Sequence, residues 1–255
     1  MPKLVEWLTT NRLSLNIGKT HSMIFGTKRK SSANNDLLDI KINNQTLEVV
    51  SHTKFLGVVI DSKLTWKEHA LYTSKKLSKS IAILSLAKKY LNQSTMIQLY
   101  YSFIFPYLSY CNLSWGNAAD NTLWPIFRNQ KIALRLISNT PRRSSTIAFC
   151  KKFQILRLPD IHRLTIGIFM YKYHHGLLPE IFTHFFTRNQ DNHSYRTRNA
   201  AKLRNPLFKT QLGTTFIKNT GVNLWNILEM NISTTDTIGT FKKHLKNYIN
   251  ITAFH

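Results

Sequence analysis

The stretch "HTKFLGVVIDSKLTWKEH", residues 52–69, joins a strand pattern to a helix pattern with almost nothing between them. Residues 55–60 form an apolar, largely β-branched run that holds one glycine, Gly57, and stops at Asp61. Thr65 and Glu68 then have the spacing of a capping box, in which the threonine hydroxyl accepts from a helix N–H and the glutamate reaches back. The sequence therefore predicts a strand that ends at Asp61 and a helix that begins at Thr65.

The regions on either side of this stretch differ in kind. Residues 20–61 are β-rich, whereas the chain after Thr65 repeats apolar residues at helical spacing. We expect an α+β protein with a small β-rich N-terminal part and a predominantly α-helical remainder. The expected elements are a helix over 3–12, a strand through 23–25, a hairpin around Asn43-Asn44, and helices from 65, over 95–110 with a break at Pro106, from 120, over 145–156, over 160–175 with Gly176 as its stop, over 179–186, and over "GVNLWNIL" and "TIGTFKKHLKNYIN".

Charge is the outlying property of the composition. The 255 residues include 35 Lys+Arg and 12 Asp+Glu, a net charge of +23, together with 43% hydrophobic residues, enough for a folded core. Solubility alone needs a net charge of only about 2 to 8. A polyanionic partner explains the excess better. Nucleic acid is the first candidate, because phosphate contacts release condensed counterions, and an anionic membrane surface is the second.

The basic residues recur in clusters on several expected helices. Any one cluster is an ordinary solvated face, but together they indicate a nucleic-acid surface. The aromatic residues between Tyr100 and Trp115 could stack bases, although their helical spacing fits a packed core better. The candidate binding residues are Lys75, Lys76 and Lys79, then Arg128, Lys131 and Arg135, then Arg142 and Arg143, with further clusters at Lys28-Arg29-Lys30 and at Arg196, Arg198 and Arg204.

The residues show no catalytic or metal site by spacing. Asp61 ends an apolar strand, where polymerases and nucleases often carry a metal-binding aspartate, but no second carboxylate stands near it in sequence, so we interpret it as a turn or cap residue. The two cysteines, Cys111 and Cys150, have no metal-ligand or disulfide pattern, which fits a reducing compartment. No apolar run is long enough to cross a membrane. We expect a soluble intracellular protein, nuclear or cytoplasmic, without a bound metal.

Four blocks carry a resemblance to a known family. "FLGVVIDSKLTWKEH" resembles the strand–helix junction that follows the catalytic motifs in reverse transcriptases of non-LTR (LINE-type, Jockey-like) retrotransposons, and "WLTTNRLSLNIGKTHSMIFG" resembles the helix, turn and strand before it. "LYYSFIFPYLSYCNLSWGNA" and "GVNLWNIL…TFKKHLKNYI" resemble later blocks of the same proteins. The resemblance implies the C-terminal part of an RNA-directed DNA polymerase: the end of the palm over 1–64, a thumb-like domain over 65–140, and an extension over 141–255 with a basic linker near 187–210.

The same resemblance implies roles for single residues. Lys19 matches a lysine that lies near the incoming triphosphate, so it is a possible auxiliary. Phe55, Leu56 and Gly57 match the primer-grip strand, where a glycine allows the backbone to approach the primer closely. The chain itself is expected to hold no cofactor, whereas Mg²⁺ serves the intact polymerase.

One part of the family's pattern has no counterpart in this sequence. The Tyr-x-Asp-Asp signature and the earlier metal-binding aspartate would precede residue 1, as in a truncated element copy or a fragmentary gene model. We therefore expect a chain that grips RNA template and DNA primer without catalysing extension. The alternative is a non-enzymatic, basic helical RNA- or DNA-binding module derived from a retroelement. The oligomeric state stays open.

Overall fold

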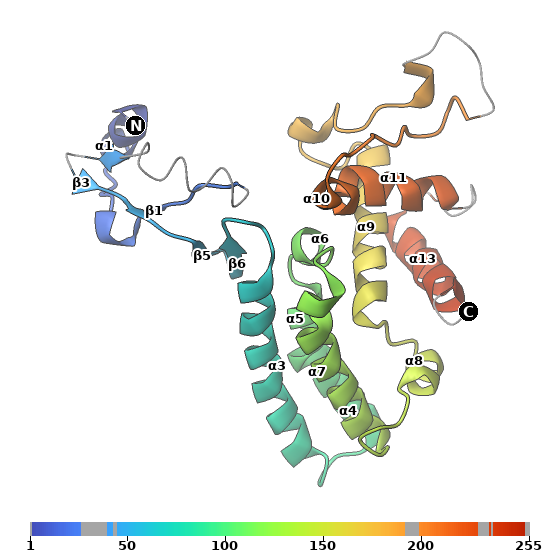
Figure 1. The fold of residues 1–255 in the computed structure, drawn as a ribbon. Coiled ribbons are helices and arrows are strands. Elements are labelled where there is room, and N and C mark those ends of the chain that lie inside the picture. The colour runs from blue at the N-terminus through green and yellow to red at the C-terminus, as the bar shows by residue number, and fades with distance from the viewer. Residues whose placement is uncertain are drawn as a thin grey trace. The chain divides into compact units, whose positions relative to one another are not determined.

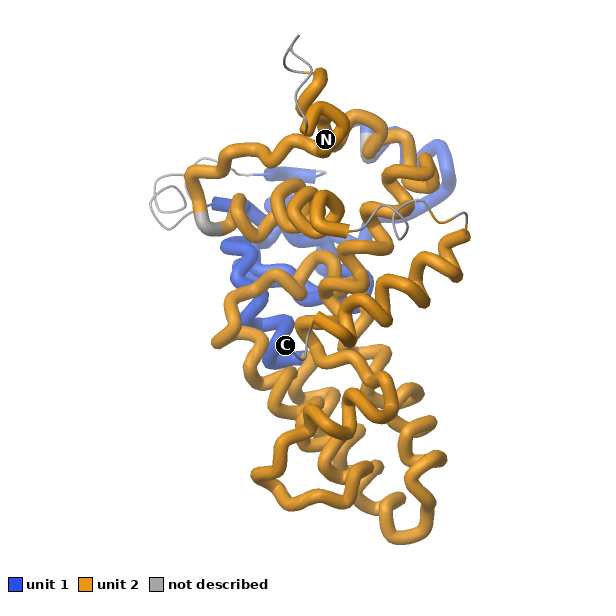
Figure 2. Tube along the Cα trace, turned by 90° about the vertical axis from the view of Figure 1, so that its right-hand side faces the viewer, with its two compact units in different colours: residues 1–72 blue, residues 73–255 orange. Residues whose placement is uncertain are grey.

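The computed structural model describes residues 2–26, 40–42, 45–191, 199–228, 235 and 237–252. The chain forms two compact units, residues 1–72 and residues 73–255, and their boundary falls within helix α3 (Lys67–Ala87) (Figure 2). The expected α+β class with mostly helical content is confirmed. The finer division at residues 64 and 140 remains a prediction.

Unit 1 (1–72) consists of short elements. Strand β1 pairs in parallel with β4, while β2 and β3 pair antiparallel, as the predicted hairpin requires; its turn residues Asn43 and Asn44 lie outside the described residues. The strand expected through 23–25 is wrong: β1 covers only His21 and Ser22, which pair with the two residues of β4. The elements are α1 (Pro2–Thr10), the 3₁₀ turn η1 (Ile17–Lys19), β1 (His21–Ser22), β2 (Lys41–Ile42), β3 (Gln45–Thr46), β4 (Glu48–Val49), β5 (His52–Phe55), β6 (Val58–Asp61) and the start of α3.

The run over residues 55–60 is not one strand, which corrects the sequence-based expectation. β5 and β6 are antiparallel, with Phe55 opposite Val58, so Leu56 and Gly57 form a two-residue turn. Both have positive φ, 45° and 85°, as in the type I′ turns whose twist matches that of the flanking strands. Gly57 takes this conformation without steric cost. The primer-grip-like residues therefore lie at the tip of a hairpin.

Unit 2 (73–255) is helical. Figure 1 shows α9 running between the α4–α7 group and the pair α11 and α13. A Cβ at Gly167 would overlap the Leu245 side chain, so this glycine permits the close approach of α9 and α13. The elements are the rest of α3, α4 (Gln93–Phe103), α5 (Phe105–Ser109), α6 (Asn112–Trp115), α7 (Asp120–Ser138), α8 (Ile147–Phe153), α9 (Leu158–His174), η2 (Glu180–Phe182), η3 (Asn189–Asp191), α10 (Gln211–Thr215), α11 (Ile217–Ile227) and α13 (Ile238–Thr252).

Most predicted helices are confirmed, including the break before Pro106, which separates α4 from α5 at Ile104. Gly176 has a φ of 64° and follows α9, as a C-terminal stop residue does. The helix predicted over 179–186 is wrong, since only η2 forms there. The Tyr173 hydroxyl donates to the Phe186 carbonyl at 3.2 Å and accepts from the Phe186 N–H, so it satisfies backbone groups that a helix would otherwise pair.

Of the aromatic residues between Tyr100 and Trp115, some lie in the packed core and others are exposed, where they could stack on bases. Tyr100 and Trp115 are fully buried, as core residues, whereas Tyr110 and Phe103 are exposed. The expected linker over 187–210 is partly structured, because Arg188 and Leu203 form a β-bridge. The basic residues 28–30, 196 and 198 lie outside the described residues.

Candidate nucleic-acid interface

Two exposed lysines lie one helical turn apart on α3. Lys75 and Lys79 are exposed at i, i+4, and therefore share a face, while Leu77 and Leu84 on the same helix are fully buried. Within the part of the chain that the structure describes, neither lysine has an acidic group in ion-pair range. Lys76 is half-buried between these two. The turn thus offers two uncompensated positive charges on a helix anchored by its other face.

Helix α7 packs against this part of α3 through a buried amide. Asn129 donates from Nδ2 to the Ser74 carbonyl at 2.9 Å and to Ser78 Oγ at 3.3 Å. Its neighbour Arg128 is exposed and, among the described residues, has no acidic partner. The side-chain bonds fix α7 against the helix that carries Lys75 and Lys79.

The other two cations of the predicted α7 row are tied to the protein. The Lys131 ammonium lies over the rings of Phe127 and Trp124, 4.1 and 5.1 Å from their centroids. Burial, with smaller contributions from Arg135 and Arg157, lowers the pKa of Lys131. Arg135 donates from Nε to the Ser144 carbonyl at 2.8 Å. Of the row Arg128, Lys131 and Arg135, only Arg128 therefore presents its charge to solvent without a contact to the protein in the described structure.

The bond from Arg135 holds the turn that follows α7. Arg142 and Arg143 lie in that turn and are exposed. Because Ser144 closes the turn by accepting from Arg135 and by donating its N–H to the Pro141 carbonyl, the backbone under the two arginines is fixed. Arg135 acts as a support for these two side chains.

The hairpin tip of unit 1 is apolar and open. The residues Phe55 and Leu56 are 60% and 74% exposed. Lys54 next to them donates to the Tyr72 hydroxyl at 3.0 Å and lies 4.9 Å from the centre of that ring. This contact ties the end of β5 to the first turns of α3.

A buried histidine makes the second tie between hairpin and helix. His69 Nδ1 accepts from the Val59 N–H at 3.3 Å, which requires the nitrogen to be unprotonated. Burial lowers the pKa of His69 to about 4, so the ring is neutral at pH 7. Sequence reasoning singled out neither Lys54 nor His69, because only the turn at Leu56-Gly57 brings them opposite α3.

Asp61 is confirmed as a turn and cap residue. Its Oδ1 accepts from the N–H groups of Lys63 and Thr65 and from the Thr65 hydroxyl, and its Oδ2 accepts from the Trp66 N–H at 2.7 Å. Both carboxylate oxygens are thus occupied by donors.

The predicted capping box does not form in the described structure. Trp66, directly before α3, has a φ of 62°, whereas a normal N-cap region is extended. Thr65 Oγ1 accepts only a long contact, 3.5 Å, from the Lys67 N–H, and Asp61 binds the preceding amides instead. The helix begins at Lys67, two residues later than the box predicts.

The remaining candidates are scattered. Lys19 ends the 3₁₀ turn η1 and is exposed. In the described ranges, no three His, Cys, Asp or Glu side chains gather closely enough to hold a metal ion. No described helix is both long and apolar enough to cross a bilayer.

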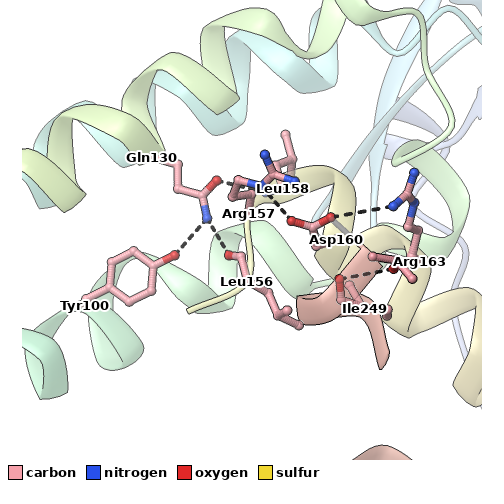
Figure 3. A network of polar contacts seen from close by, with 9 residues as sticks. Tyr100, Gln130, Leu156, Arg157, Leu158, Asp160, Arg163 and Ile249 are labelled. Atoms are coloured by element: carbon pink, nitrogen blue, oxygen red, sulfur yellow. Dashed lines mark hydrogen bonds and ion pairs between the residues drawn. The ribbon is translucent and has the colours of Figure 1, made fainter. Parts of the chain in front are cut away.

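A buried polar network joins helices of unit 2 (Figure 3). Gln130 donates from Nε2 to the Tyr100 hydroxyl and to the Leu156 carbonyl, both at 2.9 Å, and accepts from the Leu158 N–H at 2.9 Å. Asp160, also buried, pairs with Arg157 at 2.8 Å. One amide thus joins α4, α7 and the start of α9.

Comparison with known proteins finds a relative in the family that the sequence blocks resemble. The RNA-directed DNA polymerase from the mobile element jockey of Drosophila funebris is 27% identical to this chain over 139 residues. The chain resembles a non-LTR retrotransposon reverse transcriptase. The matched region covers 53% of the chain and 15% of that polymerase. No protein-family model matches the chain, and no solved structure matches it significantly.

Proposed function

We propose that this chain is a nucleic-acid-gripping part of a retrotransposon RNA-directed DNA polymerase. The observation that carries the proposal is the set of exposed cations on unit 2 without acidic partners among the described residues: Lys75, Lys79, Arg128, Arg142 and Arg143. The similarity to the jockey polymerase supports the same class of partner.

These side chains suit a phosphate backbone. Each cation that meets a phosphate releases condensed counterions, and this entropy gain does not depend on base sequence. Lys76, Lys131 and Arg135 are less available to a phosphate, because Lys76 is half-buried while Lys131 and Arg135 already contact aromatic rings and a carbonyl. Binding is expected to be strong at low salt and weakly selective.

The hairpin tip is the proposed contact for the primer end. Phe55 and Leu56 offer exposed apolar surface, and Gly57 lets the backbone approach a sugar or phosphate without a Cβ in the way. RNA template and DNA primer are the corresponding partners. Lys19, exposed on η1, is at most an auxiliary near the triphosphate.

The chain by itself is proposed not to extend a primer. Phosphoryl transfer of this kind needs carboxylates that hold metal ions between nucleophile and triphosphate. Asp61, the carboxylate that ends β6, has both oxygens bound by backbone and hydroxyl donors. We expect Mg²⁺ to serve carboxylates of an intact polymerase rather than Asp61.

The test is a salt titration of binding to an RNA–DNA duplex and to anionic lipid vesicles of phosphatidylserine and phosphatidylcholine. The proposal expects a linear fall of log affinity with log salt on the duplex, and weaker binding to vesicles at every salt concentration. Equal or tighter vesicle binding would contradict it.

A recessed primer end separates the gripping function from the alternative of a basic RNA- or DNA-binding module. The hairpin proposal expects tighter binding to a recessed 3′ end than to a blunt duplex, and loss of that preference in Phe55→Ser/Leu56→Ser. Because both side chains are exposed, the variants should fold. Equal affinity for both ends in the unsubstituted chain would favour the simple binding module.

A further inference from the structure

The C-terminal part of unit 2 contains an open cavity with aromatic walls. It lies beside the end of α9, segment 178–191 and α11, and its volume is about 550 Å³, within the range of small-molecule sites. In Figure 1 the segment passes beyond the end of α9 and beside α11. The aromatic residues that line the cavity are Tyr173, Phe182, Phe186 and Trp225, with His174 and His184 beside them.

The walls are held in place by contacts among themselves. The rings of Tyr173 and Phe186 meet edge to face at 4.7 Å, and the Tyr173 hydroxyl bonds the backbone of residue 186. Trp225 lies 5.4 Å from the His174 ring and packs with the core cluster around Met170. The cavity is thus preformed by contacts within the protein.

A cation lies on its lining without an acidic partner. Arg188 is exposed, and its guanidinium forms no ion pair with any described carboxylate. Asp191, the acid in the lining, accepts from the backbone N–H of residue 188 at 2.8 Å. Arg188 therefore leaves a positive charge beside aromatic surface.

A second cavity of about 330 Å³ shares His184 and Phe186 with the first. Arg204 and Lys218 line it, and the Lys218 ammonium lies 4.5 Å from the centre of the Phe185 ring. The two cavities therefore adjoin at His184 and Phe186, and together they are called the 184–188 track below.

We propose that the 184–188 track binds single-stranded nucleic acid, with an unstacked base in the larger cavity and flanking phosphates on Arg188, Arg204 and Lys218. Aromatic side chains stack any base, and cations follow the backbone, which is the recognition mode of single strands. A base inside a duplex is not free to enter a cavity. The inference rests on the proposed function for its ligand, nucleic acid. It places the ligand at a different site from the exposed cations of α3 and α7, and it requires a single strand instead of a duplex.

The experiment uses the full chain and a 12-nucleotide RNA that carries one 2-aminopurine, read by anisotropy and by fluorescence. Stacking in the cavity should quench the fluorophore. Arg188→Gln/Arg204→Gln should weaken single-strand binding about tenfold or more and remove the quench, because two phosphate contacts are lost. The matched control Lys242→Gln/Lys243→Gln removes two exposed lysines from α13 and should change affinity less than about twofold.

Equal loss in both double variants, or no quench at saturation, would overturn the proposal. A quench abolished by excess adenosine monophosphate at concentrations that leave anisotropy unchanged would assign the cavity to a free nucleotide and also overturn it. Duplex binding through α3 is measured in parallel. Its absence beside intact single-strand binding would contradict the proposed function and leave this site standing.

Discussion

Residues 1–72 and residues 73–255 are stabilised in different ways. In the first unit the described buried apolar side chains are few (Ile42, Leu47, Val58 and Ala70), and polar contacts at Asp61 and His69 hold the hairpin to the start of α3. In the second, large side chains such as Tyr100, Trp115 and Phe241 are fully buried between helices. Apolar burial of about 25 cal/mol per Å² therefore favours the second unit. The packed helices of unit 2 therefore hold the exposed cations on their surface at a fixed spacing.

The largest expected difference is in hydrogen exchange. Amides of β5, β6 and α1 should exchange at least about a hundredfold faster than those of the buried turns of α9, because local opening of the small unit costs less. Exchange followed by mass spectrometry on the whole chain measures this. Equal protection in both units would break the comparison.

Gln130→Ala should destabilise unit 2 by about 3 kcal/mol. The substitution removes three hydrogen bonds at a fully buried site and leaves the Leu158 N–H and the Tyr100 hydroxyl without their partner. Urea unfolding followed by tryptophan fluorescence gives the free energy. Gln98→Ala, at an exposed position of α4, is the matched control and should change it by less than about 0.5 kcal/mol.

Acid should weaken each unit through a histidine whose pKa is strongly lowered by burial, His69 in unit 1 and His162 in unit 2. Burial lowers the pKa of His69 and of His162 to about 4, so the unfolded chain binds more protons than the folded chain between about pH 6.5 and pH 4. Stability is complete above pH 6.5 and is lost as the pH falls toward 4, by about 2 kcal/mol for each histidine.

Denaturant midpoints at pH 7, 5.5 and 4.5 measure this loss, and His162→Asn should reduce the pH dependence of unit 2. The exposed His244→Asn is the control and should leave it unchanged. A pH dependence that persists in full in His162→Asn would show that another group titrates.

Asp61→Asn should have the smallest of these stability effects and should act on unit 1 alone. An amide cannot accept at both positions, so the Trp66 N–H or the Thr65 N–H loses its partner, at a cost of about 1 to 2 kcal/mol. Faster exchange of the amides at the start of α3 would show it, with Asp120→Asn as an exposed control. Unchanged exchange there would mean that Asp61 does not hold the junction.

Sequence reasoning succeeded where apolar residues repeat at helical spacing over many residues. The helices from Asp120 and up to Gly176 follow from repeated apolar spacing and from their terminal residues. The packed face of α7 includes Ile126, Gln130 and Leu134, whereas Leu123 and Phe127 are only half-buried.

Sequence reasoning failed where the structure depends on unusual backbone angles or on contacts between residues far apart in the sequence. The turn at Leu56-Gly57 needs two positive φ angles, and the left-handed Trp66 displaces the capping box; neither follows from apolar periodicity. The track around residue 186 is assembled from α9, segment 178–191 and α11, so its parts are far apart in sequence. A cation within an aromatic-rich stretch, "FTHFFTR", was the available signal.

The salt dependence of duplex binding tests the central claim most directly, because that claim places the grip on exposed cations of unit 2. Lys75→Gln/Lys79→Gln should reduce the slope of log affinity against log salt by about 1.8, that is about 0.9 for each phosphate contact. Lys131→Gln, whose ammonium already lies over two rings, is the control and should change the slope by less than about 0.5. An unchanged slope in the Lys75→Gln/Lys79→Gln variant would contradict the account.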